Sequence, residues 1–492
     1  MNTTSFTILI LILYLIALKL VSVAAYKKSQ NTTEDYFLAS RGVGFLALIA
    51  TTIASVFSTG TVVAAPSEFY TKGGQYFFFL WFTWICFTMA LLGLKIWKLG
   101  KAKNFITPGE LLADFYQSKR VHIISALIGL LSLVPYAVAQ LVAIGKTFEA
   151  LTAGTVNYQL GIIIVCVAMG LYLYYGGSRA VIWTDMIQGV IFCSLLITSA
   201  GLILYWAGGW NNVTQNLLNN YPDKAIVSNS DVKYFEMFLL PLSFLFLPHI
   251  WQRLYMAKSA ATLSKNIMII PFVVSILFFS TWVIGTSGLV LFPNGLADGD
   301  ALLGAIFKTN APYFGAFVLV AAFAAGMSTI DSQLLSSGAI ITRDLRPIFN
   351  ALVFKNKKLE AVPDYAFART VTILLLLFAF VWSLTLKSTS VFSLIILGMS
   401  IAVVLMPCVL GLFFWKKSTE AGAFWSMTIG LLVFLIKQFT SYGDYFPTKL
   451  GGVSWALITA SCIFIISGLL SQKSNLSDKI EEYKKILFFK DL

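Results

Sequence analysis

The stretch Ala324-Ala325-Gly326-Met327-Ser328-Thr329-Ile330-Asp331-Ser332-Gln333 places hydroxyl groups and a carboxylate in the middle of a long apolar run, residues 311–341. A run of this length can cross a bilayer as a helix. At about 100° per residue, its small and hydroxyl residues fall on one narrow face, with Asp331 at the edge. This face carries Ala325, Ser328, Thr329, Ser332 and Ser336.

Polar oxygen atoms at membrane depth have two common explanations. They line an ion or substrate path, or they bond one helix to its neighbour. Asp331 favours the first interpretation, because an ionised carboxylate away from water needs a cation or a strong partner.

The composition is that of a membrane protein. Of the 492 residues, 58% are hydrophobic and 12% are charged, whereas soluble domains carry about 25% charged residues. Apolar runs long enough to span a bilayer recur about thirteen times, which predicts an all-α polytopic membrane protein with about thirteen transmembrane helices. The five cysteines lie far apart in apolar runs, and there are two histidines. This pattern argues against a disulfide framework and a histidine metal site.

The charges predict how the chain is oriented. Most of the 35 lysines and arginines lie in alternate loops, and positively charged loops face the cytoplasm. The N-terminus is therefore expected outside and the C-terminus inside a plasma (inner) membrane. The net charge of +13 then faces the anionic inner leaflet and does not indicate nucleic-acid binding. The amphipathic tail, residues 474–492, is expected to lie on the inner membrane surface.

The order of the runs suggests a single transporter domain, residues 1–492, with two five-helix blocks. Because each block has an odd number of spans, the second is inverted relative to the first. The expected divisions are a peripheral first helix and cytoplasmic loop (1–41), a first repeat (42–206), an extracytoplasmic loop (207–233), an inverted second repeat (234–415), two peripheral helices (416–472) and a cytoplasmic tail (473–492).

Small and hydroxyl residues interrupt the first helix of the first block at residues 51–61. Sodium takes several oxygen ligands, and an unwound helix exposes carbonyls that an intact helix does not. The candidate ligands are the carbonyls of Ala54, Phe57 and Ala325 and the hydroxyls of Ser328 and Thr329. A small-residue face for close helix packing is the alternative, and spacing alone leaves both interpretations open.

A second carboxylate, Asp185, lies in the sixth apolar run, with Arg179 nearer its cytoplasmic end. Asp185 either pairs with Arg179 or caps a helix near the interface, or it binds a cation or gates the route to the cytoplasm.

Four motifs together resemble the sodium:solute symporter family, which includes sodium-coupled proline, pantothenate, sugar and sialic acid transporters. The motifs are Gly176-Gly177-Ser178-Arg179-Ala180-Val181-Ile182-Trp183-Thr184-Asp185-Met186-Ile187-Gln188, the 327–335 stretch followed by Thr342-Arg343-Asp344-Leu345, Tyr36-Phe37-Leu38-Ala39-Ser40-Arg41 and Leu247-Pro248-His249-Ile250-Trp251-Gln252-Arg253. The resemblance implies a leucine-transporter-type fold with two inverted five-helix repeats and extra helices at both ends.

The resemblance also implies site residues. The general sodium site of the family falls on Ala54, Phe57, Ala325, Ser328 and Thr329. A further cation site, present in members such as sialic acid transporters, falls on Asp185, Ser328, Asp331 and Ser332. Asp331 departs from those members, which have a hydroxyl there, so the number of coupled ions stays open.

For the substrate, Ser58 and Thr61 match positions that contact substrate in sialic acid and sugar transporters. Tyr136 resembles a substrate-side tyrosine of proline transporters. Trp81, Gln140 and Phe244 either line the same cavity or serve as packing residues.

We therefore expect a sodium-coupled symporter that takes up a small organic solute by alternating access, not an enzyme. Its partners would be sodium as the coupling ion, the solute and the lipid bilayer, with a monomer as the functional unit. Two alternatives stay open. One is a proton-coupled transporter that uses Asp331 or Asp185, and the other is a transporter-like nutrient sensor.

Overall fold

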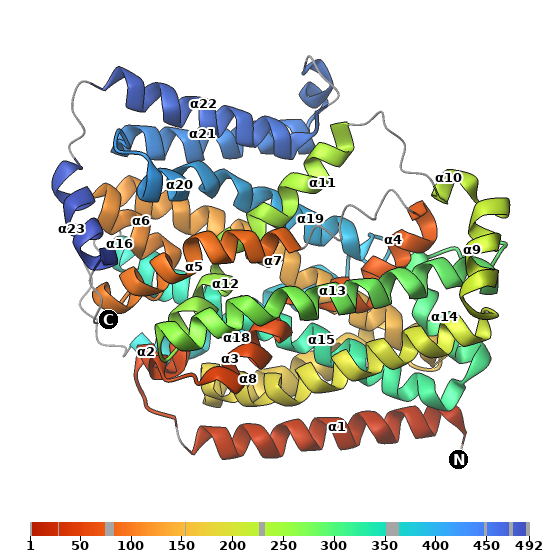
Figure 1. Cartoon of the computed structure of the whole chain (residues 1–492). Helices are drawn as coiled ribbons and strands as arrows, with labels where there is room; N and C mark the ends of the chain where they lie inside the picture. Colours follow the sequence, from red (N-terminus) through yellow and green to blue (C-terminus); the bar gives the residue numbers. More distant parts are fainter. Residues whose placement is uncertain are drawn as a thin grey trace.

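Long α-helices run side by side through the protein in the computed structural model of Figure 1. The structure describes residues 2–27, 29–73, 83–152, 154–225, 232–350, 364–446, 450–471 and 476–488. Within these ranges, 9 helices are long and apolar enough to cross a membrane, or 10 if the bent pair 45–56 and 60–72 is one span. The described ranges contain no β-strand, so the prediction of an all-α membrane protein is confirmed.

The helix bounds are as follows. The first half of the chain forms α1 (Thr3–Tyr26), α2 (Thr33–Leu38), α3 (Phe45–Val56), η2 (Gly60–Ala64), α4 (Ala65–Lys72), α5 (Thr83–Lys103), α6 (Pro108–Tyr116), α7 (Lys119–Leu151), α8 (Tyr158–Trp206), α9 (Gly209–Asn220) and α10 (Pro222–Ala225). The second half forms α11 (Val232–Ser243), α12 (Pro248–Met256), α13 (Ala260–Leu291), α14 (Leu302–Asn310), α15 (Pro312–Ala339), η6 (Ile340–Leu345), α16 (Arg346–Phe349), α18 (Asp364–Ser383), α19 (Val391–Ala402), α20 (Met406–Phe414), α21 (Glu420–Phe439), α22 (Gly452–Leu470) and α23 (Ser477–Phe488).

The break predicted in the 42–70 run is confirmed. Helix α3 ends at Val56, and η2 begins at Gly60. The two parts are bent by 53° at this point. Phe57 leaves the helix with an extended backbone, at φ −96° and ψ 127°, so the helical hydrogen-bond ladder stops there.

Helix α8 is long enough for two spans. Its 49 residues would extend about 74 Å, more than twice the hydrocarbon core of a bilayer. Gly177 interrupts it with φ 50° and ψ −147°, a conformation that residues with a side chain avoid. Tyr172 and Asp185 lie on either side of Gly177, yet both reach the centre, where they contact Asp331 of α15 and Arg253 of α12. The chain therefore turns back at Gly177, and the count of thirteen spans stays a prediction.

The helices around the break occupy the middle of the bundle. Helix α15 packs against α3, α7 and α8, while α1 lies at one edge and the pair α21 and α22 at the other (Figure 1). Helix α1 begins at the end of the bundle opposite to α23 (Figure 1), as expected for an odd number of crossings. The expected loop at 207–233 contains the short helices α9 and α10.

The described part of the tail packs on the protein itself. The Tyr483 side chain of α23 is buried, its ring lies 5.2 Å from that of Phe115 in α6, and its hydroxyl donates to Asp114 Oδ2 at 2.8 Å. Tyr483 of α23 is thus covered by α6, and the expectation that the tail lies on the inner membrane surface stays a prediction.

Candidate ion and substrate site

The break between α3 and η2 is stabilised by side chains that replace the missing helical bonds. Gln140 of α7 accepts two hydrogen bonds through its Oε1, from Thr59 N at 2.9 Å and Thr59 Oγ1 at 2.6 Å. Ser58 Oγ accepts from Gly60 N at 2.9 Å. These side chains satisfy the first backbone N–H groups of the helix that follows the break.

The same break frees carbonyls at the end of α3. The helical donor for Phe57 O would be Thr61 N, which bonds instead to Ser58 O at 2.9 Å. The extended backbone at Phe57 likewise turns the following N–H away from Ala54 O. Two buried carbonyls are thus available to side chains from another helix.

Two hydroxyls of α15 meet these carbonyls. Ser328 Oγ lies 3.0 Å from Ala54 O, and Thr329 Oγ1 lies 3.3 Å from both Ala54 O and Phe57 O. The carbonyl of Ala325 is 3.1 Å from the Ser328 hydroxyl and 3.0 Å from the Thr329 hydroxyl. Five oxygen atoms from the five residues singled out in the sequence therefore converge at one point, and all five residues are buried.

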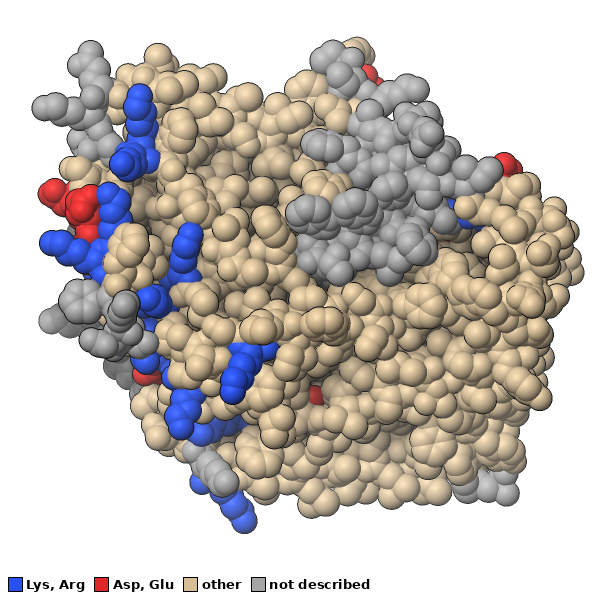
Figure 2. Space-filling model, in the orientation of Figure 1, with Lys and Arg blue, Asp and Glu red and all other residues tan. Residues whose placement is uncertain are grey.

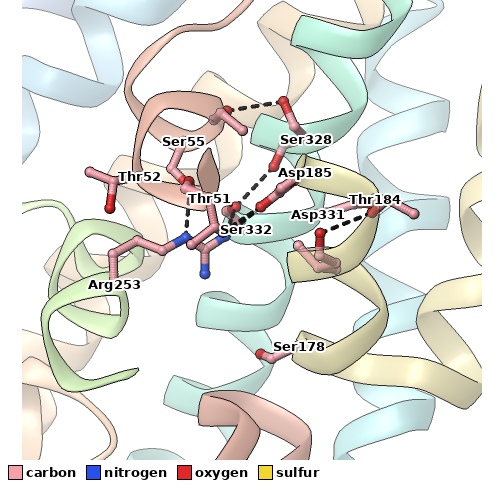
Figure 3. Close-up of polar contacts among 12 residues, drawn as sticks. Thr51, Thr52, Ser55, Ser178, Thr184, Asp185, Arg253, Ser328, Asp331 and Ser332 are labelled. Carbon is pink, nitrogen blue, oxygen red and sulfur yellow. Dashed lines mark hydrogen bonds and ion pairs between the residues drawn. The ribbon is translucent and has the colours of Figure 1, made fainter. Parts of the chain in front are cut away.

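A second polar group lies one turn further along α15, and Figure 3 shows it. Asp185 of α8 accepts from Thr51 Oγ1 at 2.5 Å and lies 3.6 Å from Arg253 Nη2. Ser332 Oγ lies 3.1 Å from Ser55 Oγ and donates to Ser328 O at 2.9 Å. This group therefore adjoins the five oxygen atoms through Ser328.

The Asp331 side chain points away from this second polar group, toward the half of α8 that precedes Gly177. Its Oδ2 accepts from the Tyr172 hydroxyl at 2.5 Å. Among the described residues, Oδ1 of Asp331 and Oδ1 of Asp185 have no hydrogen-bond partner. The two carboxylates that the sequence singled out thus lie in one buried region and keep acceptor capacity.

The substrate candidates form a neighbouring group of partly aromatic residues. Tyr136 of α7 and Phe244, just before α12, both lie 6.0 Å from the ring of His249. Ser58 lies close to Tyr136, and Thr61 is buried in η2. Gln140 joins this group through its amide nitrogen, which donates to Tyr136 O at 3.2 Å. Trp81 lies outside the described residues.

The sequence alone indicates no role for Arg253 or for the hydroxyls of Thr51, Ser55 and Tyr172. Arg253 follows directly on an apolar run, yet only 1% of it is exposed. The hydroxyls at 51 and 55 are four residues apart, so they share one face of α3. That spacing is the signal in the sequence that could have identified these hydroxyls. Their partners could not be identified, because they lie far away in the sequence.

Comparison with known proteins decides the family. The sodium:solute symporter family matches residues 36–430. The chain belongs to this family. The symporter is 27% identical over 451 residues to the sodium/pantothenate symporter of Escherichia coli (strain K12), covering 87% of this chain and 90% of that protein. It is 26% identical over 491 residues to the high-affinity proline transporter PutP of Bacillus subtilis (strain 168), covering 94% and 98%.

Solved structures agree on the fold of the symporter. It resembles a substrate-bound outward-open Na+-coupled sialic acid symporter with a TM-score of 0.79 and 18% identity, over 96% of this chain and 99% of that one. It resembles MhsT in complex with L-phenylalanine with a TM-score of 0.54 and 13% identity, over 87% and 98%. The fold is therefore of the leucine-transporter type, and the protein is a multi-pass membrane transporter of a sodium-coupled family, not an enzyme.

Proposed function

We propose that the symporter binds its coupling sodium ion at Ala54, Phe57, Ala325, Ser328 and Thr329. The observation that carries this proposal is the convergence of three carbonyls and two hydroxyls at the break between α3 and η2. Oxygen is the ligand that hard cations take. The two hydroxyls now donate to the carbonyls, and each would have to turn its lone pairs toward the ion.

Sodium at this point would link α15 to the broken helix. Such a link favours the conformation in which η2 and α4 can receive a solute, and the two repeats then rock to expose it inward. The coupling is reciprocal, because sodium must tighten solute binding by the same factor by which the solute tightens sodium binding. A membrane potential of about 100 mV adds about 2.3 kcal/mol per inward charge, or roughly 50-fold accumulation.

We propose a small carboxylate-bearing metabolite as the solute. Relatives named for pantothenate and proline transport handle compounds that share a carboxylate. Ser58, Thr61 and Tyr136 would supply hydroxyl contacts, and Phe244 and Gln140 would form the wall of the cavity.

The end of the bundle that holds α23 is proposed to face the cytoplasm. Figure 2 shows lysines and arginines gathered at this end of the visible face, and the rest of that face is nearly free of them. Positive charge of this kind faces the inner leaflet. The C-terminus would then be cytoplasmic and the N-terminus outside.

A thermal-shift screen tests the sodium coupling. Purified protein would be titrated with sodium chloride or potassium chloride and with a panel that includes pantothenate, proline and short monocarboxylates. A transported compound should raise the Tm more in sodium than in potassium, because each ligand stabilises the state that binds the other. Equal shifts in both salts for every stabilising compound would count against sodium coupling.

The double substitution Ser328→Ala plus Thr329→Ala tests the site. Loss of two of five oxygen ligands should abolish the sodium-dependent Tm shift while the folded protein is retained. Ser194→Ala plus Thr370→Ala is the matched control, because these exposed hydroxyls bond only within their own helices. An unchanged sodium affinity in the first variant would remove both residues from the ion site.

A further inference from the structure

Arg253 lies at the centre of the second polar group, although its residue type is among the least tolerated in a membrane interior. Its side chain extends from α12 between α3 and α15 (Figure 3). Its Nε donates to Ser55 Oγ at 2.7 Å, and its Nη2 donates to Ser332 Oγ. The same Nη2 lies 3.6 Å from Asp185 Oδ2. A guanidinium keeps its charge in such a position and offers five donors.

These contacts engage two of the four residues that the family resemblance implies for a second cation. Ser332 Oγ and Asp185 Oδ2 both face the Arg253 guanidinium. A third, Ser328, belongs to the five-oxygen site. The fourth, Asp331, accepts from Tyr172. A sodium ion between Ser332 and Asp185 would have to occupy the place of a fixed positive group.

The buried charges lead to the same conclusion. With both carboxylates ionised, Asp185 and Asp331 bring two negative charges and Arg253 brings one positive charge, in side chains that are at most 1% exposed. Ser328 and Ser332 are one turn apart, so a sodium ion on Ser328 would lie roughly 6 Å along the helix axis from Ser332. One sodium ion would complete the neutralisation of this group, whereas two would leave a buried excess of positive charge, which is strongly unfavourable.

We propose that the Arg253 guanidinium is the resident cation of the second site, so that the symporter carries one sodium ion per transport cycle. This inference rests on the proposed sodium site. In this proposal Arg253 sets the number of sodium ions per cycle, although it is not itself a sodium ligand.

Equilibrium binding of radioactive sodium to purified protein tests the inference without a substrate. The wild type should bind one ion per chain with a Hill coefficient of 1. Arg253→Met removes the charge and keeps much of the apolar stem, so it should bind two ions per chain. Its Tm should then rise about twice as steeply with the logarithm of sodium concentration, because stabilisation scales with the number of ions bound to the folded state. Arg253→Lys keeps the charge and should bind one ion.

Several results would overturn the inference. A wild type that binds two sodium ions contradicts the inference even if every variant fails to fold. A folded Arg253→Met variant that binds only one sodium ion also contradicts it. The triple variant with Ser328→Ala, Thr329→Ala and Arg253→Met should bind one ion at Asp185 and Ser332, where the guanidinium lies in the wild type. If the double variant Ser328→Ala plus Thr329→Ala binds as many ions as the wild type, the proposed sodium site is contradicted. If the wild type binds two ions and this double variant binds one, only the role of Arg253 is contradicted.

Discussion

The Tyr172 hydroxyl bonds to Asp331 from the first half of α8, so it ties a carboxylate of α15 to a different helix. This bond matters because Asp331 is buried and its other oxygen atom has no partner among the described residues. Asp185 is supported in the same way by Thr51 of α3. At the scale of single residues, the carboxylates are thus held by hydroxyls on neighbouring helices.

We expect Tyr172→Phe to lower the thermal stability of the protein. The substitution keeps the ring and removes the donor, which leaves a buried carboxylate unsatisfied and costs about 1–3 kcal/mol. The measurement is the Tm in detergent at fixed sodium concentration. Tyr174→Phe is the control, because Tyr174 lies on the same helix and is 39% exposed. Equal effects of the two substitutions would show that the bond to Asp331 contributes little.

At the scale of helices, the bundle depends on close approaches where a side chain would not fit. Gly398 of α19 faces α7, and a Cβ on it would lie 2.4 Å from Ser132 O and 3.1 Å from Tyr136 Cβ. The first contact is with backbone, so it cannot be relieved by a side-chain rotation. Helix α19 therefore packs directly on the part of α7 that carries a candidate substrate residue.

Gly398→Ala should force α19 away from α7 and destabilise the protein by about 1–3 kcal/mol, as overpacking does. The sodium-dependent Tm shift should persist, because the five oxygen atoms come from α3, from Phe57 directly after it and from α15. Gly170→Ala on α8 is the control, since its Cβ would make an ordinary contact of 3.7 Å with Leu376. A Tm equal to that of Gly170→Ala would contradict the close packing of α19 on α7.

Some of this arrangement could be predicted from sequence because it follows from local rules. The polar face of α15 follows from helical periodicity, and the end of α3 follows from the small residues around Ser55. The contacts of Arg253 could not be predicted, because they join α12 to residues about 80 and 200 positions away, and the apolar run before it gives no sign of its direction. For the same reason, the amphipathic pattern of α23 predicted an apolar side but not the surface that covers it.

At the scale of the whole molecule, the described tail helix joins the C-terminus to the proposed cytoplasmic end. Glu482 of α23 forms an ion pair with Lys103 of α5, and Lys479 lies 3.1 Å from Asp114 of α6. The neighbouring Lys103 and Lys479 lower the pKa of Glu482 below its ordinary value of 4.5. The docking of α23 therefore depends on the ionised form of this carboxylate.

We expect Glu482→Gln to loosen α23 at neutral pH, because it removes the charge that pairs with α5. The measurement is amide hydrogen exchange of residues 477–488, corrected for the intrinsic rate, which should become faster than in the wild type. Glu481→Gln is the matched control, because Glu481 pairs with Lys484 inside the same helix and does not join α23 to α5. Its exchange should match the wild type.

The same carboxylate sets the pH and salt dependence of the docking. Because Lys103 of α5 lowers the pKa of Glu482 in the docked helix, this contribution is fully present above the ordinary value and is lost as the pH falls through the lowered one. Protection of 477–488 in the wild type should therefore fall in acid and in about 1 M salt, where exposed pairs are screened. The Glu482→Gln variant should show a weaker dependence on both. Equal dependence in the two proteins would mean that Glu482 does not set the pH and salt dependence of the docking.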